Sequence, residues 1–385
     1  MVKTRISGSQ AVVLLFLSRM FALLTVSGGR DGQVGGGLAV LAALCSFLFQ
    51  LALFLPGWLL ARRHPGQNFA EAVTGCLGGA GRGVSLLLWL LLVLLAGMSA
   101  AEFEHFLVSA VYEQAPRLLF AFLFLAAAIY GAWLGLEAFG RFAYFGFTVF
   151  ALLAVSLCFS LAGDFQTGEL FAQTSASPAS FLRTAWSMAA GDIELLCFFL
   201  LLPSLRTGED KGAPAGKGLF FAWNGLYTLA AAGFILLTVG VLGGNPSTGQ
   251  SYPFYTLACA AEGSLLARTD AIHMSMWGIL GLLRCCLLLY CASIALRCAV
   301  TVSSRRKSLL NWAAGHRTAV TAFIAFAAAL LLAGSPAALN GLRRIWGGGI
   351  PILCVLALFP AAALVAGAVR SKKRRKEAAG HGEAP

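Results

Sequence analysis

The stretch from Ala267 to Ala299 constrains this chain most, because it has the composition of one long apolar helix with a polar seam along one side. At a rise of about 1.5 Å per residue, a helix from Thr269 to Val300 would be roughly 48 Å long. The hydrocarbon core of a bilayer is only about 30 Å thick, so such a helix must tilt or project from it. The stretch therefore predicts a membrane-spanning helix.

The seam consists of residues spaced three, four and seven apart, so they lie on nearly one face of the helix. They are Asp270, His273, Trp277, Arg284 and Cys291. An ionisable side chain at bilayer depth costs about 2.5 kcal/mol or more, and we therefore expect the seam to face a protein bundle or a hydrated cavity. For single residues a simpler interpretation stays open, in which Asp270 lies among the headgroups and His273 is a packing residue.

The composition excludes a soluble fold, because 59% of the 385 residues are hydrophobic and 11% are charged. The mean hydropathy is +0.81. The apolar runs are continuous rather than alternating, which excludes a barrel and predicts an all-α polytopic membrane protein. We expect ten transmembrane helices, near residues 10–27, 37–60, 83–110, 118–135, 141–162, 180–203, 218–243, 269–300, 317–335 and 347–369.

Lys and Arg residues concentrate in the loops on one side of these helices, which predicts that both termini are cytoplasmic. The formal net charge of +12 follows this pattern, so it indicates orientation and contact with anionic lipids rather than with nucleic acid. Ten helices divide into five and five of opposite orientation, which is the arithmetic of an inverted-topology repeat. We expect one domain over residues 1–369, with halves near 10–162 and 180–369, followed by a basic, disordered cytoplasmic tail over 370–385.

Ionisable residues inside the expected helices are candidate functional residues. Gly191, followed by Asp192 and Glu194, suits a helix break at the membrane midplane, where free backbone groups and helix dipoles can bind a solute. Without such a break, at most one of the two carboxylates points inward. We expect Arg19 to pair with Glu194. The candidate ligand-binding residues are Arg19, Glu104, His105, Glu194, His273 and Trp277.

No phosphate-binding loop, nucleophile elbow or zinc motif is present, so we expect neither an enzyme nor a cofactor or metal site. Most of the ten cysteines lie inside apolar runs, where they act as small apolar packing residues. Cys285, Cys286 and Cys291 form the one cluster, for which metal or redox use is the alternative.

Short motifs follow one another along the chain. They are Ile6-Ser7 with Gln10, Glu102-Phe103, Gly135-Leu136-Glu137 with Gly140-Arg141, Glu194 before Pro203, and Arg268-x-Asp270-Ala271 followed by Ser275-x-Trp277 and Tyr290. In this order and spacing they resemble the spore germination permease family. These are the membrane B subunits of nutrient-germinant receptors, within the amino acid–polyamine–organocation superfamily.

The resemblance implies a ten-helix fold of the LeuT type and a role in sensing small nutrients, often amino acids, in a dormant spore. It also implies two partner subunits, a large membrane subunit with a soluble domain and a lipoprotein, in the spore inner membrane. One departure concerns the ligand. The family tends to have Gly-x-Gly in the first helix, whereas this chain has Phe21-Ala22-Leu23, which hinders close approach of backbone to a ligand.

Together these features predict a germinant-receptor permease subunit in the spore inner membrane or cell membrane, which binds a small solute near the midplane and signals by a shift between helical bundles. Two alternatives stay open, a proton-coupled amino-acid or amine transporter and a non-transporting scaffold. The Glu137–Arg141 and Arg268–Asp270 pairs are expected to fix loops and helix ends rather than to touch the ligand.

Overall fold

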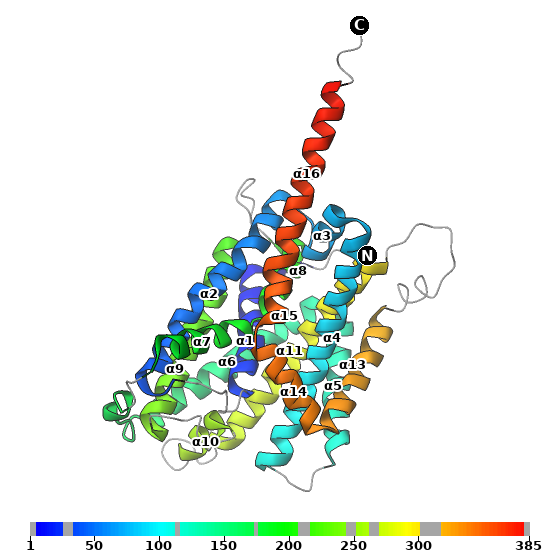
Figure 1. Cartoon of the computed structure of the whole chain (residues 1–385). Helices are drawn as coiled ribbons and strands as arrows, with labels where there is room; N and C mark the ends of the chain where they lie inside the picture. The colour runs from blue at the N-terminus through cyan, green and yellow to red at the C-terminus, as the bar shows by residue number, and fades with distance from the viewer. Residues whose placement is uncertain are drawn as a thin grey trace.

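A computed structural model shows the protein as a bundle of long helices (Figure 1). It describes residues 5–25, 34–111, 116–172, 176–206, 216–243, 252–261, 269–300 and 317–380. In chain order the helices are α1 (Gly8–Thr25), α2 (Gly36–Arg63), α3 (Phe69–Leu77), α4 (Gly79–Phe106), α5 (Arg117–Leu134), α6 (Leu136–Ser160), α7 (Pro178–Ala190), α8 (Glu194–Leu201), α9 (Lys217–Leu242), α10 (Pro253–Ala260), α11 (Thr269–Val300), α13 (Arg317–Ala333), α14 (Pro336–Gly347), α15 (Ile350–Leu353) and α16 (Phe359–Gly380).

Each of the ten segments expected to span the membrane coincides with a helix or helix pair. Within the described residues, eight helical stretches are long and apolar enough to cross a membrane. A ninth is obtained if α13 and α14, which meet at a bend of 111°, count as one span, and α5 is a shorter apolar helix. The structure thus confirms an all-α membrane protein, while the count of ten crossings stays a prediction.

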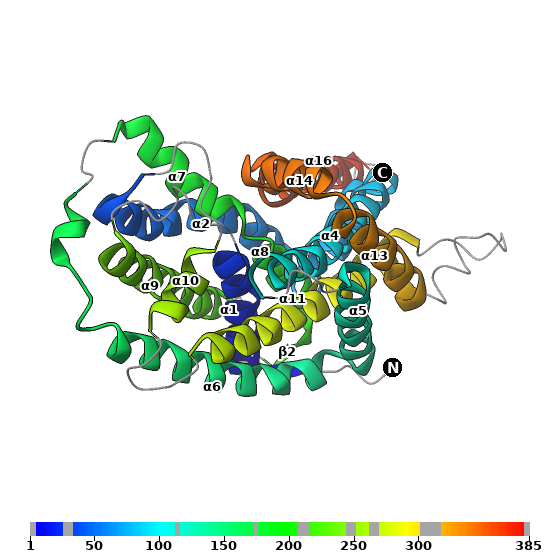
Figure 2. The ribbon, with the colours of Figure 1, turned by 90° about the horizontal axis from the view of Figure 1, so that it is seen from below.

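The helix α11 lies at the centre of the bundle. It packs against α1, α4, α5, α6 and α13, and Figure 2 shows it surrounded by them. Four members of its seam, namely His273, Trp277, Arg284 and Cys291, are buried. The expectation that the seam faces protein rather than lipid is confirmed for these four residues, because the neighbouring helices cover that side of α11.

The break expected near Gly191 is present. The helix α7 ends at Ala190 and α8 begins at Glu194, with a turn between them. All eight residues of α8 are buried. By contrast, α1 runs without interruption from Gly8 to Thr25, through the positions where the family that the motifs resemble tends to have Gly-x-Gly.

A short parallel strand pair connects the start of α1 to the end of α8. The sequence predicts that both of these helix ends lie on the cytoplasmic side. The strand β1 (Ile6–Ser7) pairs with β2 (Leu205–Arg206), with Ile6 opposite Leu205 and Ser7 opposite Arg206. The start of the unbroken helix α1 is therefore joined by backbone hydrogen bonds to the segment that follows α8.

The last helix extends further than the sequence indicated. The chain was expected to be disordered from residue 370, but α16 continues to Gly380, and its end projects beyond the other helices (Figure 1). A run of Lys, Arg, Glu and Ala has high helix propensity, so the helix continues after its apolar part ends. The division of the chain into repeat halves stays a prediction.

Candidate ligand-binding site

Four charged side chains meet around the break between α7 and α8. Arg19 of α1 forms an ion pair with Asp192, and Arg284 of α11 forms an ion pair with Glu194. All four side chains are at most 6% exposed. The expected pairing of Arg19 with Glu194 is therefore wrong. The turn between the two helices lets both carboxylates point inward, and each binds a different arginine.

The Glu194–Arg284 pair connects four helices. The Ser18 hydroxyl of α1 donates a hydrogen bond to Glu194 Oε1 (2.7 Å). Arg284 donates from Nη1 to the Ser18 carbonyl oxygen (3.1 Å) and from Nε to the Ser99 hydroxyl of α4 (3.2 Å). Glu194 also lies in the first turn of α8, where the helix dipole favours a negative charge. The pair is thus stabilised by hydrogen bonds as well as by charge.

The Arg19–Asp192 pair lies at the other end of the break. Arg19 Nη2 donates to the Met188 carbonyl oxygen (3.3 Å), one of the last carbonyl groups of α7, which lack partners within the helix. The guanidinium carbon lies 4.0 Å from the ring centroid of Tyr227 and 5.9 Å from that of Trp223, both on α9. A cation therefore meets the carboxyl end of α7, as an anion meets the amino end of α8.

Aromatic rings of α1, α4 and α11 pack against one another near these pairs. Trp277 stacks on Phe21 (centroids 5.2 Å apart) and on Phe103 (5.1 Å), and its indole donates to the Thr25 hydroxyl (2.8 Å). A Cβ atom at Gly281 would lie 2.7 Å from Phe21 Cε2. Phe21 of α1 therefore packs into the space left by the missing side chain of Gly281 on α11. The glycine that allows this close packing lies on α11 and not on α1.

The other candidate residues lie farther along the same helices. His273 is buried beside Tyr255, with ring centroids 6.1 Å apart, and its Nδ1 has no hydrogen-bond partner among the described residues. Glu104 is buried on α4, and His105 beside it is half-buried. His273 lies about three turns before Arg284 on α11, and Glu104 lies about one and a half turns after Ser99 on α4.

A smaller polar cluster lies toward the end of α4. Arg343 of α14 donates to Glu102 (3.1 Å), and the Ser109 hydroxyl donates to that of Tyr252 (3.4 Å). Burial raises the pKa of the Tyr252 hydroxyl above its ordinary value. This cluster connects α14 to the end of α4.

Of the two charged pairs expected to be structural, only Glu137–Arg141 lies wholly within the described residues. Arg141 forms an exposed ion pair with Glu137 (2.5 Å) in the first turns of α6. Asp270 lies in the first turn of α11, half-buried, but Arg268 lies outside the described residues. Glu137 and Arg141 lie at the start of a helix, and their structural role stays a prediction.

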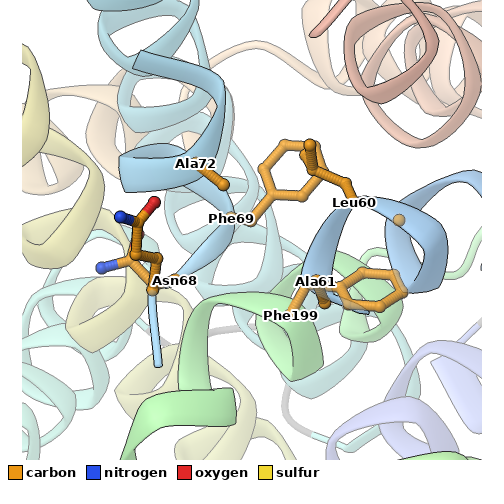
Figure 3. A pocket seen from close by; sticks show the side chains of 8 residues that line it. Leu60, Ala61, Asn68, Phe69, Ala72 and Phe199 are labelled. Atoms are coloured by element: carbon orange, nitrogen blue, oxygen red, sulfur yellow. The ribbon is translucent and has the colours of Figure 1, made fainter. Parts of the chain in front are cut away.

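No metal-binding cluster marks the site in the described part of the chain. No group of three or more His, Cys, Asp or Glu side chains there could bind a metal ion. A small pocket lies between α2, α3 and α8 (Figure 3), and none of the four charged residues lines it. It is lined by Gly57, Leu60, Ala61, Gln67, Asn68, Phe69, Ala72 and Phe199.

Sequence reasoning placed Arg284 in the seam but did not identify it as the partner of Glu194. Its seven-residue spacing from Trp277 was the available signal. Ser18 and Tyr227 carried no such signal, because a hydroxyl in an apolar run is common. Their roles depend on which helices lie beside α1, and the tertiary structure alone determines that.

The comparison with protein families identifies the chain. The profile of a family described as "Spore germination protein" matches residues 5–332. The chain belongs to the spore germination protein family. The motifs that resembled this family therefore indicated it correctly. No curated protein sequence matches the chain.

Solved structures confirm that this family member has the LeuT fold of transporters. One is similar to it with a TM-score of 0.63 at 13% identity, over 92% of this chain and 78% of the other. That structure is Mhp1, a nucleobase-cation-symport-1 family transporter in a closed conformation with bromovinylhydantoin bound. Another is MhsT in complex with L-phenylalanine, with a TM-score of 0.52 at 15% identity, over 94% of this chain and 98% of the other. The protein is thus a permease-like integral membrane protein.

Proposed function

We propose that the protein is the permease-like subunit of a germinant receptor, which binds a small nutrient at the break between α7 and α8 and signals germination. The observation that carries the proposal is the pair of buried ion pairs that join α1 and α11 to the two ends of the broken helix. A solute that competes for one of these charges would change how the helices are held together. Binding is thereby coupled to a shift of one helical bundle against the other.

The ligand class is an amino acid or a solute of similar size and polarity. The two ends of the break offer a partial negative charge at α7 and a partial positive charge at α8, which suit the ammonium and carboxylate groups of an amino acid. In this structure Arg19 donates to the Met188 carbonyl oxygen at the end of α7, and Glu194 lies in the first turn of α8. Mhp1 binds a hydantoin and MhsT binds L-phenylalanine, so cyclic ureides and amino acids are the classes to test first.

The receptor would contain two further subunits, a large membrane subunit with a soluble domain and a lipoprotein, and would reside in the spore inner membrane with both termini of this chain in the cytoplasm. Genes for such subunits beside this one would support the proposal. Glu104, His105, His273 and Trp277 are proposed to shape the outer part of the ligand path, whereas Arg19 and Glu194 are nearest the ligand.

The test combines binding with transport. Purified protein is screened by thermal shift against amino acids and hydantoin, and the same compounds, radiolabelled, are offered to proteoliposomes. A ligand that raises the melting temperature but is not taken up supports a sensor. Uptake that an uncoupler abolishes would instead favour the proton-coupled transporter, with Glu194 or Glu104 as the proton carrier. If no compound binds to the wild type or to the Glu194→Gln and Arg19→Ala variants, a scaffold is favoured.

A further inference from the structure

The two ends of the break differ in how completely their polar atoms are paired. Asn224 of α9 is fully buried, yet neither its amide oxygen nor its amide nitrogen has a hydrogen-bond partner among the described residues. The same holds for the indole nitrogen of Trp223 and for Oδ1 of Asp192, whereas at the α8 end one carboxylate oxygen, Oε2 of Glu194, is unpaired. Buried polar groups are nearly always hydrogen-bonded, so a cluster of unpaired ones needs an explanation.

These atoms belong to one compartment, which we call the α9 compartment and define by Arg19, Asp192, Trp223, Asn224 and Tyr227. The rings of Trp223 and Tyr227 both lie over the guanidinium of Arg19, which pairs with Asp192. Asn224 is adjacent to Trp223 and three residues before Tyr227, a spacing that places it on the same side of α9.

A further unpaired acceptor lies at the interface of α9 with α2. Gln50 is fully buried, and its Oε1 has no partner in the described part of the chain. Gln50 is one turn from Phe54 and Asn224 is one turn from Phe220, and the rings of Phe54 and Phe220 stack at 4.0 Å. The two amides therefore occupy the same part of the α2–α9 interface.

Other buried polar residues of α9 show that the helix does not leave such groups unpaired in general. The Thr228 hydroxyl donates to the Asn224 carbonyl oxygen (2.8 Å), and the Thr238 hydroxyl donates to that of Phe234 (2.7 Å). Within the described residues, the unpaired side-chain atoms of α9 all belong to the α9 compartment, where both donors and acceptors lack partners. A ligand that satisfies them must offer both.

We propose that the α9 compartment is a recognition subsite for a neutral ligand group that both donates and accepts hydrogen bonds, such as a carboxamide, with Asn224 as its main contact. The charges of Arg19 and Asp192 balance each other, so an additional buried charge would have no partner there, and a neutral group is favoured. The subsite would open when α9 separates from α7. This inference rests on the proposed function, because it names the ligand group that the same break recognises.

Thermal shift of the purified full chain tests the subsite. The probes are L-asparagine, L-aspartate and L-leucine, whose side chains have similar shapes, together with acetamide as the isolated amide. We expect L-asparagine and acetamide to raise the melting temperature of the wild type more than the other two do. The variant Asn224→Leu should bind L-asparagine at least about tenfold more weakly, and Trp223→Phe should weaken it to a smaller extent.

The apo proteins supply the control. Asn224→Leu should have an unchanged or higher melting temperature without ligand, because it removes an unpaired buried amide. Thr238→Val, on the same helix, should leave the response to every probe unchanged. If Asn224→Leu does not fold, Trp223→Phe decides the outcome.

The outcomes separate the two proposals. Equal responses of wild type and variants to L-asparagine would overturn the subsite and leave the sensor intact. An Asn224-dependent response to acetamide, without a response to any amino acid of the wider panel, would support the subsite and overturn an amino-acid sensor. No response of the wild type to L-asparagine or acetamide would overturn the subsite, whereas the sensor is overturned only if the wider panel of amino acids and hydantoin also gives no response.

Discussion

The two ends of the broken helix solve the same electrostatic problem in different ways. At the amino end of α8, Glu194 receives hydrogen bonds from both Ser18 and Arg284, and Arg284 in turn reaches Ser99. At the carboxyl end of α7, Arg19 pairs with Asp192 beside aromatic rings. The first end is a hydrogen-bond network of three helices around α8 in which one carboxylate oxygen, Glu194 Oε2, is unpaired, whereas the second leaves several neighbouring donors and acceptors unpaired.

This difference shows that balancing the charges of buried groups and satisfying their hydrogen bonds are separate requirements. Both pairs cancel their charges, which a bilayer interior demands. Only the α8 end also satisfies nearly all of its donors, and it is therefore expected to be the mechanical link between α1, α4 and α11. The α7 end is expected to be the more responsive one, because its unpaired groups gain hydrogen bonds when a ligand arrives.

The largest expected effect is at the α8 end. Arg284→Ala leaves Glu194 buried without a charged partner and should lower the free energy of unfolding by about 3–5 kcal/mol. Arg141→Ala is the matched control, because its pair with Glu137 is exposed and should contribute only about 0–1 kcal/mol. Denaturant or thermal unfolding of the solubilised protein measures both. Similar losses in the two variants would contradict the assigned role of Arg284.

The next effect is at the α7 end. Arg19→Met should destabilise the protein by about 2–3 kcal/mol, since it removes a charged hydrogen bond and the contact with Tyr227 while Asp192 stays charged. Adding Asp192→Asn should restore part of this loss. Adding Glu194→Gln instead should not, because Glu194 pairs with Arg284. Rescue by Glu194→Gln alone would show that the pairing is the one expected from sequence.

A smaller effect is expected where Phe21 of α1 packs against Gly281 of α11. Gly281→Ala would place a Cβ atom 2.7 Å from Phe21 Cε2, and the resulting overpacking should cost about 1–3 kcal/mol. Gly278→Ala is the control on the same helix, because its nearest neighbour, Phe103 Cε2, would be at 3.5 Å. Combining Gly281→Ala with Phe21→Leu should recover stability. Equal melting temperatures for the two single variants would contradict the close packing of α1 on α11.

The sequence by itself determined the class of fold and the location of the break. Continuous apolar runs require helices, since backbone groups in lipid must bond within their own segment. The small residue Gly191 before two carboxylates indicated the interruption, and the seam of α11 indicated its buried side. Arg19, Glu194, His273 and Trp277 were all located in the interior from these patterns alone.

The tertiary structure decided which charges meet. Asp192 and Glu194 are only two residues apart, so the pattern of α8 could not say which arginine binds each carboxylate. That choice depends on the direction of the chain through the turn and on which helices pack beside it. The same is true of Asn224, a single amide in an apolar run, whose unpaired state follows from its neighbours on other helices. Helix formation depends on local spacing, whereas pairing depends on contacts between segments that are far apart in the chain.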